Sequence, residues 1–127
     1  MDVDKMPRLL LIGVLTALPL VYSCGSSPSS PTGAAATISI GPNGVSPAEV
    51  RIEAWGQVQF INNDSRPHSI VSDPVDVHSD CPQLNQVGTL QPGESRNTLT
   101  LNLPKTCGFH DHLFKTDPSL QGRIIVR

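Results

Sequence analysis

Residues 45–70, VSPAEVRIEAWGQVQFINNDSRPHSI, decide the fold class of this chain. In residues 50–54 the apolar side chains occupy every second position, so they share one face of a strand while the charged side chains face water. Gly56 interrupts this run, and a second strand is expected at residues 58–61 before the polar loop at residues 62–65. The stretch therefore predicts two half-buried strands in sequence.

Short apolar or alternating runs continue on both sides of this stretch, separated by clusters of Gly, Pro, Asn and Asp. That spacing is typical of an antiparallel sandwich or barrel. The strictest alternation lies in residues 98–103, which are expected to form the clearest strand, and residues 73–86 are expected to form a long surface loop with a short helical turn. Further strands are expected at residues 37–40, 68–71 and 122–126.

The first residues of the chain have the pattern of an export signal. Lys5 and Arg8 precede an apolar run at residues 9–21, which is shorter than the roughly 20 residues of a membrane-spanning helix. We therefore divide the chain into a signal peptide (residues 1–23), a flexible linker (residues 24–36) and one folded domain (residues 37–127).

Residues 21–24, VYSC, resemble the lipobox of bacterial lipoproteins, in which the signal is cut before a cysteine that then carries lipid. The resemblance implies that Cys24 attaches the protein to a membrane surface. The predicted location is the cell envelope, either periplasmic or at the cell surface. The uncharged residues 25–36, GSSPSSPTGAAA, would form the tether.

Composition limits the folded part to one modest domain. The net charge is −2, and it stays −2 without the leader, which holds two acidic and two basic residues. No basic excess points to nucleic acid as a partner. After the leader the aromatic residues are Trp55, Phe60, Phe109 and Phe114, and we expect Trp55 to pack in the core.

Residues with metal-binding side chains crowd into one part of the chain, between residues 68 and 112. Imidazole and thiolate groups are good copper ligands, and two histidines with one cysteine form the trigonal site of blue-copper proteins. The crowding predicts a site for one copper ion. The residues concerned are His68, His78, Cys81, Cys107, His110 and His112.

Three motifs resemble the cupredoxin family, which includes plastocyanin, amicyanin and pseudoazurin: residues 45–70, the turn LQPGES at residues 90–95, and CGFH at residues 107–110. The resemblance covers residues 38–126. It implies an all-β fold, a cupredoxin-like Greek-key β-sandwich, that binds one copper ion. It also implies that His68, Cys107 and His110 are copper ligands.

Two departures from the family leave the ligand set open. No methionine follows Cys107, so His112 is expected to take the place of the usual axial thioether. Cys81 has no counterpart in the family's pattern and could form a disulfide with Cys107, because exported proteins favour disulfides. Copper would then be bound by His68, His110 and His112, with His78 as a further candidate.

The leading functional hypothesis is single-electron transfer outside the cytoplasm, with an unknown redox protein as partner. The alternatives are copper sequestration or delivery without a redox role, and a structural or interaction sandwich held by the disulfide. An enzyme is not expected, because the sequence has no recognisable set of nucleophile, base and acid.

Overall fold

The computed structural model describes residues 33–127, which form strands and short 3₁₀ turns. The predicted signal peptide, Cys24 and most of the predicted linker lie outside the described residues. The strands are β1 (Ala36–Gly41), β2 (Gly44–Ser46), β3 (Glu49–Ile52), β4 (Val58–Asn62), β5 (His68–Ser72), β6 (Gly88–Leu90), β7 (Ser95–Asn97), β8 (Lys105–Asp111) and β9 (Gln121–Val126), and the 3₁₀ turns are η1 (Pro82–Gln86), η2 (His112–Phe114) and η3 (Pro118–Leu120).

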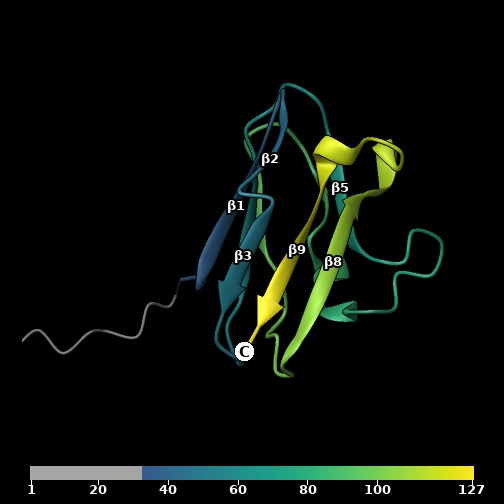
Figure 1. The fold of residues 1–127 in the computed structure, drawn as a ribbon. Coiled ribbons are helices and arrows are strands. Elements are labelled where there is room, and N and C mark those ends of the chain that lie inside the picture. The colour runs from purple at the N-terminus through teal and green to yellow at the C-terminus, as the bar shows by residue number, and fades with distance from the viewer. Residues whose placement is uncertain (1–32) are drawn as a thin grey trace, which may run out of the picture.

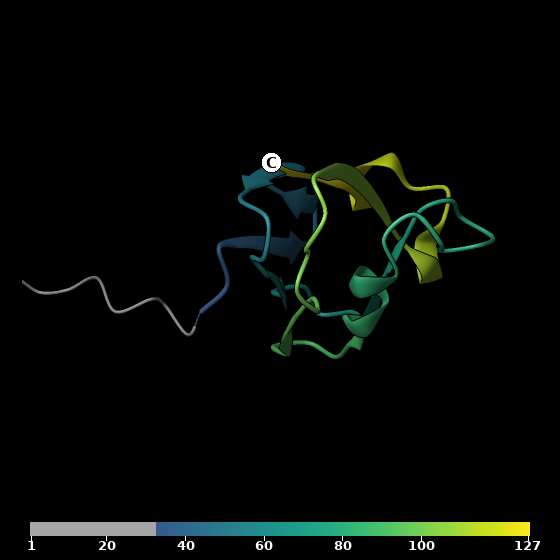
Figure 2. The ribbon, with the colours of Figure 1, turned by 90° about the horizontal axis from the view of Figure 1, so that it is seen from below.

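The strands form two mixed sheets that make up the two layers of a sandwich (Figures 1 and 2). One sheet has the order β2-β1-β4-β7, and the other has the order β3-β9-β8-β5-β6. Strand β1 runs parallel to β4 and β3 runs parallel to β9, whereas the other neighbouring pairs are antiparallel. This all-β architecture confirms the predicted fold class.

The core lies between the sheets and follows from the two-residue period of the strands. In β4, Val58, Phe60 and Asn62 are buried, and the residues between them are half-buried. Phe60 meets Phe109 of β8 edge to face, with ring centroids 5.1 Å apart and ring planes at 85°. Because these rings come from opposite sheets, they join the two layers at the centre of the sandwich.

Trp55 is not a core residue, and the expectation that it packs inside is wrong. Its side chain is 73% exposed. Trp55 lies in the turn between β3 and β4 with φ of 74°, and its N–H donates to the carbonyl of Leu101. This left-handed backbone turns the residue out of the alternation of the flanking strands, so its ring does not reach the space between the sheets.

Residues 98–103 do not form the strand that their alternation predicts. Consecutive backbone N–H groups in this segment donate to different parts of the molecule: that of Thr98 to Val58, and that of Leu99 to Gln83. Leu101 forms only an isolated bridge with Gly56. The segment therefore crosses from one sheet to the other without following a single neighbour.

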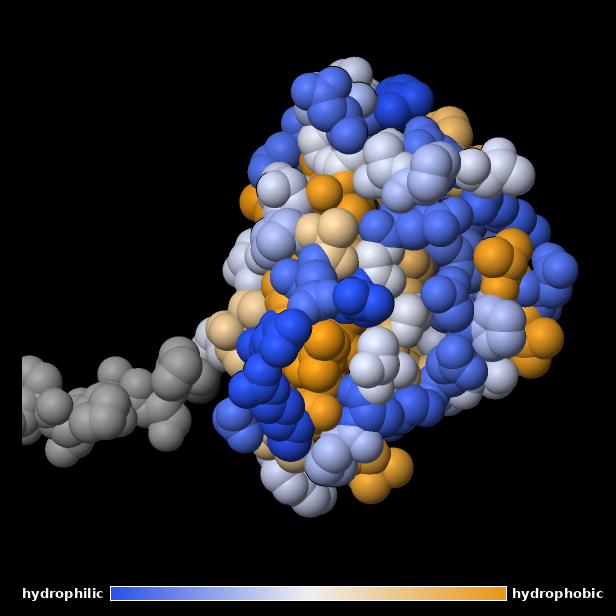
Figure 3. Space-filling view, in the orientation of Figure 1, coloured by the Kyte–Doolittle hydropathy of each residue, from blue (hydrophilic) through white to orange (hydrophobic). Residues whose placement is uncertain are grey.

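In residues 33–127, no helix is long and apolar enough to cross a bilayer. On the face shown in Figure 3, apolar residues form separate patches among polar ones. Such scattered patches are ordinary for the surface of a folded domain.

Candidate metal centre

The candidate metal centre lies on the outer side of the β8 sheet, and the alternation of β8 explains why. Phe109 and Asp111 are buried and face the space between the sheets. His110 lies between them in sequence and therefore points to the other side, next to Val71 of β5. The loop at residues 73–81 and η2 lie on this side of the molecule (Figures 1 and 2).

Three histidines converge there: His78 from the loop, His110 from β8 and His112 from η2. Each offers one ring nitrogen, and these nitrogens lie within 4.8 Å of one another. The ring centroid of His78 is 5.3 Å from that of His110 and 5.0 Å from that of His112. Segments far apart in the sequence thus bring three imidazoles to one point.

Each of the three rings has one buried nitrogen without a hydrogen-bond partner: Nε2 of His78, Nε2 of His110 and Nδ1 of His112. A buried polar atom without a partner costs free energy, and native proteins rarely leave one unexplained. Three such atoms on neighbouring rings are the donor set that a metal ion would satisfy, because neutral imidazole is a common metal ligand. The residues present therefore fit a metal ion.

Asp73 orients the ring of His110. The Nδ1 atom of His110 donates to Oδ1 of Asp73 at 2.7 Å, so in the neutral ring the lone pair lies on Nε2, the nitrogen without a hydrogen-bond partner. A carboxylate on the far nitrogen of a metal-binding histidine fixes its tautomer and raises its basicity. Gly108 makes room for this contact, because a Cβ atom there would clash with the carboxylate of Asp73.

The loop of His78 has a defined backbone. His78 has a φ of 55°, a left-handed conformation that is uncommon for residues other than glycine. Its N–H donates to the carbonyl of Pro74 at 2.8 Å, and its carbonyl accepts from Nδ2 of Asn85 at 2.9 Å. Hydrogen bonds on both sides of the residue hold this conformation and, with it, the direction of the imidazole.

The surroundings of His112 favour the neutral form of its ring. Burial lowers the pKa of His112, and the positive charges of Lys115, His78 and His110 lower it further, while Asp111 opposes them. A neutral imidazole keeps the lone pair that a metal needs. Protons therefore compete less for this ring than for an exposed histidine.

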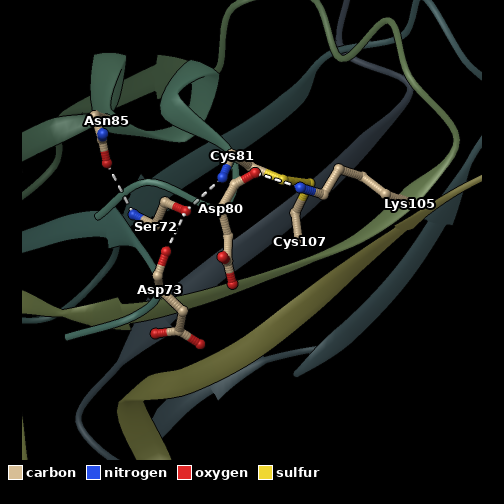
Figure 4. Close-up of a disulfide and its surroundings, with 7 residues drawn as sticks. All are labelled: Ser72, Asp73, Asp80, Cys81, Asn85, Lys105 and Cys107. Atoms are coloured by element: carbon tan, nitrogen blue, oxygen red, sulfur yellow. Dashed lines mark hydrogen bonds between the residues drawn. A yellow bond between two sulfur atoms is a disulfide. The ribbon is translucent and has the colours of Figure 1, made fainter. Parts of the chain in front are cut away.

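Cys107 does not supply a thiolate, because it forms a disulfide with Cys81, with the Cα atoms 5.7 Å apart (Figure 4). The structure therefore has the second of the two arrangements that the sequence left open. The alternation of β8 also places Cys107 on the face opposite to His110. The expectation that Cys107 and His110 share one ion is thus corrected.

His68 does not join the other histidines, which corrects its expected role as a ligand. Residues 68, 70 and 72 of β5 are buried between the sheets, on the face opposite to His110. The Nδ1 atom of His68 donates to Asp111 at 2.5 Å, and its Nε2 atom donates to Asp64 at 2.8 Å. Both ring nitrogens are therefore occupied by carboxylate partners.

The hydrogen-bonded pair of His68 and Asp111 lies behind the candidate metal centre. Asp111 also accepts the backbone N–H groups of Ser69 and Leu113, and the second of these bonds caps η2. Because His112 begins η2, the cap from Asp111 helps to fix the turn that carries this ligand candidate. His68 packs behind this cap as a hydrogen-bond partner of Asp111.

Sequence reasoning ranked His78 below the other histidines and did not consider Asp73. A signal for His78 was present, because it lies three residues before Cys81, while His110 lies three residues after Cys107. A disulfide between the cysteines brings the two histidines near each other. No comparable signal marks Asp73, since its contact depends on the backbone path of the loop.

The sequence matches no protein-family model and no curated protein sequence. Comparison with solved structures, in contrast, finds many matching chains, among them a purple cupredoxin, plastocyanins and amicyanins. A purple cupredoxin from Nitrosopumilus maritimus is 24% identical with a TM-score of 0.57, and the match covers 72% of this chain and 99% of that chain. Oxidised plastocyanin from Dryopteris crassirhizoma is 19% identical with a TM-score of 0.56, over 72% of this chain and 99% of that one.

A reduced amicyanin variant gives a TM-score of 0.60 at 13% identity, over 75% of this chain and 83% of that chain. A copper-containing nitrite reductase from Thermus scotoductus gives 0.56 at 22% identity, over 72% of this chain and only 22% of that chain. At these identities the comparisons establish the cupredoxin fold, which confirms the expected architecture.

Proposed function

We propose that this protein binds one copper ion through His78, His110 and His112, and that it sequesters or delivers copper outside the cytoplasm. The proposal rests above all on three histidines that bring one ring nitrogen each to within 4.8 Å of one another. Each of these rings also has one buried nitrogen without a hydrogen-bond partner. Imidazole suits several transition metals, and Cu²⁺ binds nitrogen ligands more tightly than the other divalent metals of its row. The cupredoxin fold, which copper proteins share, favours the same ion.

The ligand chemistry favours holding copper over passing electrons. A blue-copper carrier uses a cysteine thiolate, whereas the disulfide leaves Cys107 without one. Both methionines of the chain, Met1 and Met6, lie in the predicted leader, so the folded part offers no thioether either. What the proposed site offers is nitrogen donors alone.

Single-electron transfer is the second candidate, and the rigidity of the site favours it. His110 lies on β8, between β5 and β9. Asp73 fixes the ring of His110, and Asn85 fixes the backbone of His78. A bound copper ion would supply a one-electron redox couple. Fixed ligands would then limit rearrangement between its two oxidation states.

We extend the proposal to an exported protein that is held at a membrane through lipid on Cys24. The Cys81–Cys107 disulfide supports export, because disulfides persist in oxidising compartments and are rare in the cytosol. The proposal assigns the chain no catalytic step.

A competition titration with a copper(II) chelator tests the proposed ligand set. The full chain is compared with the His78→Ala, His110→Ala and His112→Ala variants. Each variant should lose more affinity than the roughly 10- to 100-fold that loss of an outer-shell partner costs. Wild-type affinity in any of them would remove that histidine from the site.

Voltammetry of the copper-loaded protein separates the two candidate functions. A copper couple that is reversible, together with slow metal exchange, would favour electron transfer. Rapid exchange of copper with an acceptor chelator, without a reversible couple, is the result expected for sequestration or delivery.

A further inference from the structure

The disulfide joins the two segments that carry the proposed copper ligands. Cys81 ends the loop of His78, and Cys107 lies on β8 three residues before His110 (Figure 4). The S–S bond therefore ties the loop covalently to the strand. Breaking this bond would allow the distance between two of the three ligand candidates, His78 and His110, to change.

Apart from the disulfide, the loop is held by hydrogen bonds and not by buried side chains. In residues 73–81, Cys81 is the only residue that is buried, and the others are exposed or half-buried. Val77, next to His78, is 67% exposed. The remaining contacts are hydrogen bonds. At the start of the loop, Asp73 is bonded to Gly108 and His110 of β8, and further along, the N–H of Cys81 donates to Ser72 and Asn85 donates to the carbonyl of His78. Residues 74–80, which have no buried side chain, therefore open at lower free-energy cost than the core once Cys81 is released.

A surface cavity of about 130 Å³ leads to the disulfide, since both cysteines line it. Leu101, Leu103 and Lys105 also line it, and the ammonium of Lys105 donates to the backbone carbonyl of Asp80. The volume suits a small thiol rather than a folded protein. A thiolate is the form that attacks a disulfide, and the lining offers it one cationic side chain, Lys105, besides one acidic side chain, Asp80.

We propose that the Cys81–Cys107 disulfide is a redox switch for the three-histidine site, opened by a small monothiol that enters this cavity. This inference rests on the proposed copper-binding function. A thiolate from the monothiol attacks one sulfur, the S–S bond breaks, and the other cysteine leaves as a thiolate that takes up a proton. A second monothiol then releases the first, so two electrons pass to the protein and the monothiol becomes its own disulfide. His78 is thereby freed from β8, and copper is released.

Amide hydrogen exchange without metal tests whether the disulfide holds the loop of His78 in place. The disulfide-bonded chain is compared with Cys81→Ser/Cys107→Ser, both in a Cys24→Ser background that removes the third cysteine. The amide of His78 should exchange at least about tenfold faster in the open variant, while that of Phe60 in the core stays protected. Unchanged exchange at His78 would overturn the switch, and so would equal acceleration at Phe60, because the change would then be global unfolding.

The effect on copper is measured by chelator competition on the same two proteins. We expect the open variant to bind copper(II) at least about tenfold more weakly. Equal affinity would overturn the switch. If the disulfide-bonded protein binds no copper, the proposed function fails, while the exchange experiment still decides whether the disulfide positions the loop.

The cavity is tested by the rate at which a small monothiol reduces the disulfide, followed by mass spectrometry in the Cys24→Ser background. Leu103→Trp, which fills the cavity, should slow reduction at least about fivefold, because attack requires access to a sulfur. Leu99→Trp is the matched control, since Leu99 is also exposed but does not line the cavity. Equal rates of disulfide reduction in the two variants would contradict the proposal that the monothiol enters through this cavity.

Discussion

At the scale of single residues, two kinds of histidine share this small domain. His68 has both ring nitrogens on carboxylates, whereas His78, His110 and His112 each keep one buried nitrogen unpartnered. Histidine content alone does not separate these roles. The partners of each ring nitrogen do, because a nitrogen that already donates to a carboxylate has no lone pair for a metal.

His68→Gln should destabilise the protein without changing the metal ligands. Loss of the imidazole leaves Oδ2 of the fully buried Asp111 without its hydrogen-bond partner, which costs about 1 to 3 kcal/mol of unfolding free energy. Urea denaturation measures this loss. A variant as stable as wild type that no longer binds copper would show instead that His68 is a ligand.

Acid should weaken the fold through Asp64. Its hydrogen bond with His68, helped by the N–H of Ser65 and by Arg66, lowers the pKa of Asp64 from 3.8 to about 2 against the effect of burial. The charged form is thus favoured in the folded state, so its contribution to stability is complete above about pH 4 and is lost as the pH falls toward 2.

Unfolding free energies measured across this pH range should therefore fall less steeply in Asp64→Asn than in wild type. The matched control is Asp76→Asn, which changes a carboxylate that is largely exposed and 3.9 Å from Lys115. An Asp64→Asn variant with the same slope as wild type would contradict the assigned cause.

At the scale of the elements, β8 separates the core from the site by the alternation of its side chains. Phe109 and Asp111 face the interior, while Gly108 and His110 lie on the outer face of the sheet. Both glycines near this strand are required by close contacts. A Cβ atom on Gly108 would meet the carboxylate of Asp73, and one on Gly122 would meet the ring of Phe109 and the carbonyl of Ala48.

Gly108→Ala and Gly122→Ala should therefore have different effects. The first displaces Asp73 from His110 and should lower copper affinity about tenfold or more, with little loss of stability. The second overpacks the core and should cost about 1 to 3 kcal/mol of unfolding free energy while copper affinity is kept. Chelator competition and urea denaturation on both variants check this, and identical effects of the two substitutions would contradict the assignment of faces to β8.

At the scale of the whole molecule, the sequence predicts the fold better than the site. The alternation in residues 50–54 and 58–61 predicts two strands, which the structure confirms as β3 and β4. Local pattern misleads at residues 98–103, where the alternating side chains lie on a crossing between the sheets, and at Trp55, whose turn points it to solvent.

The site was only partly predictable, because its geometry depends on which strand face each residue occupies. His110 and His112 were expected near a metal, and the disulfide was one of two open alternatives. Separating His68 from the others required the register of β5 against β8, which pairs Val71 with His110 and places residue 68 on the inner face. Sequence spacing does not contain that register.

The central claim is that three imidazoles on the outer side of β8, and no sulfur, hold the copper ion. Pulsed electron paramagnetic resonance of the copper(II)-loaded full chain counts the bound imidazoles directly. We expect three in the wild type and in His68→Gln, and two in His78→Ala, without the intense visible absorption of a copper–thiolate bond. A thiolate band in the wild type, or loss of an imidazole in His68→Gln but not in His78→Ala, would contradict the account.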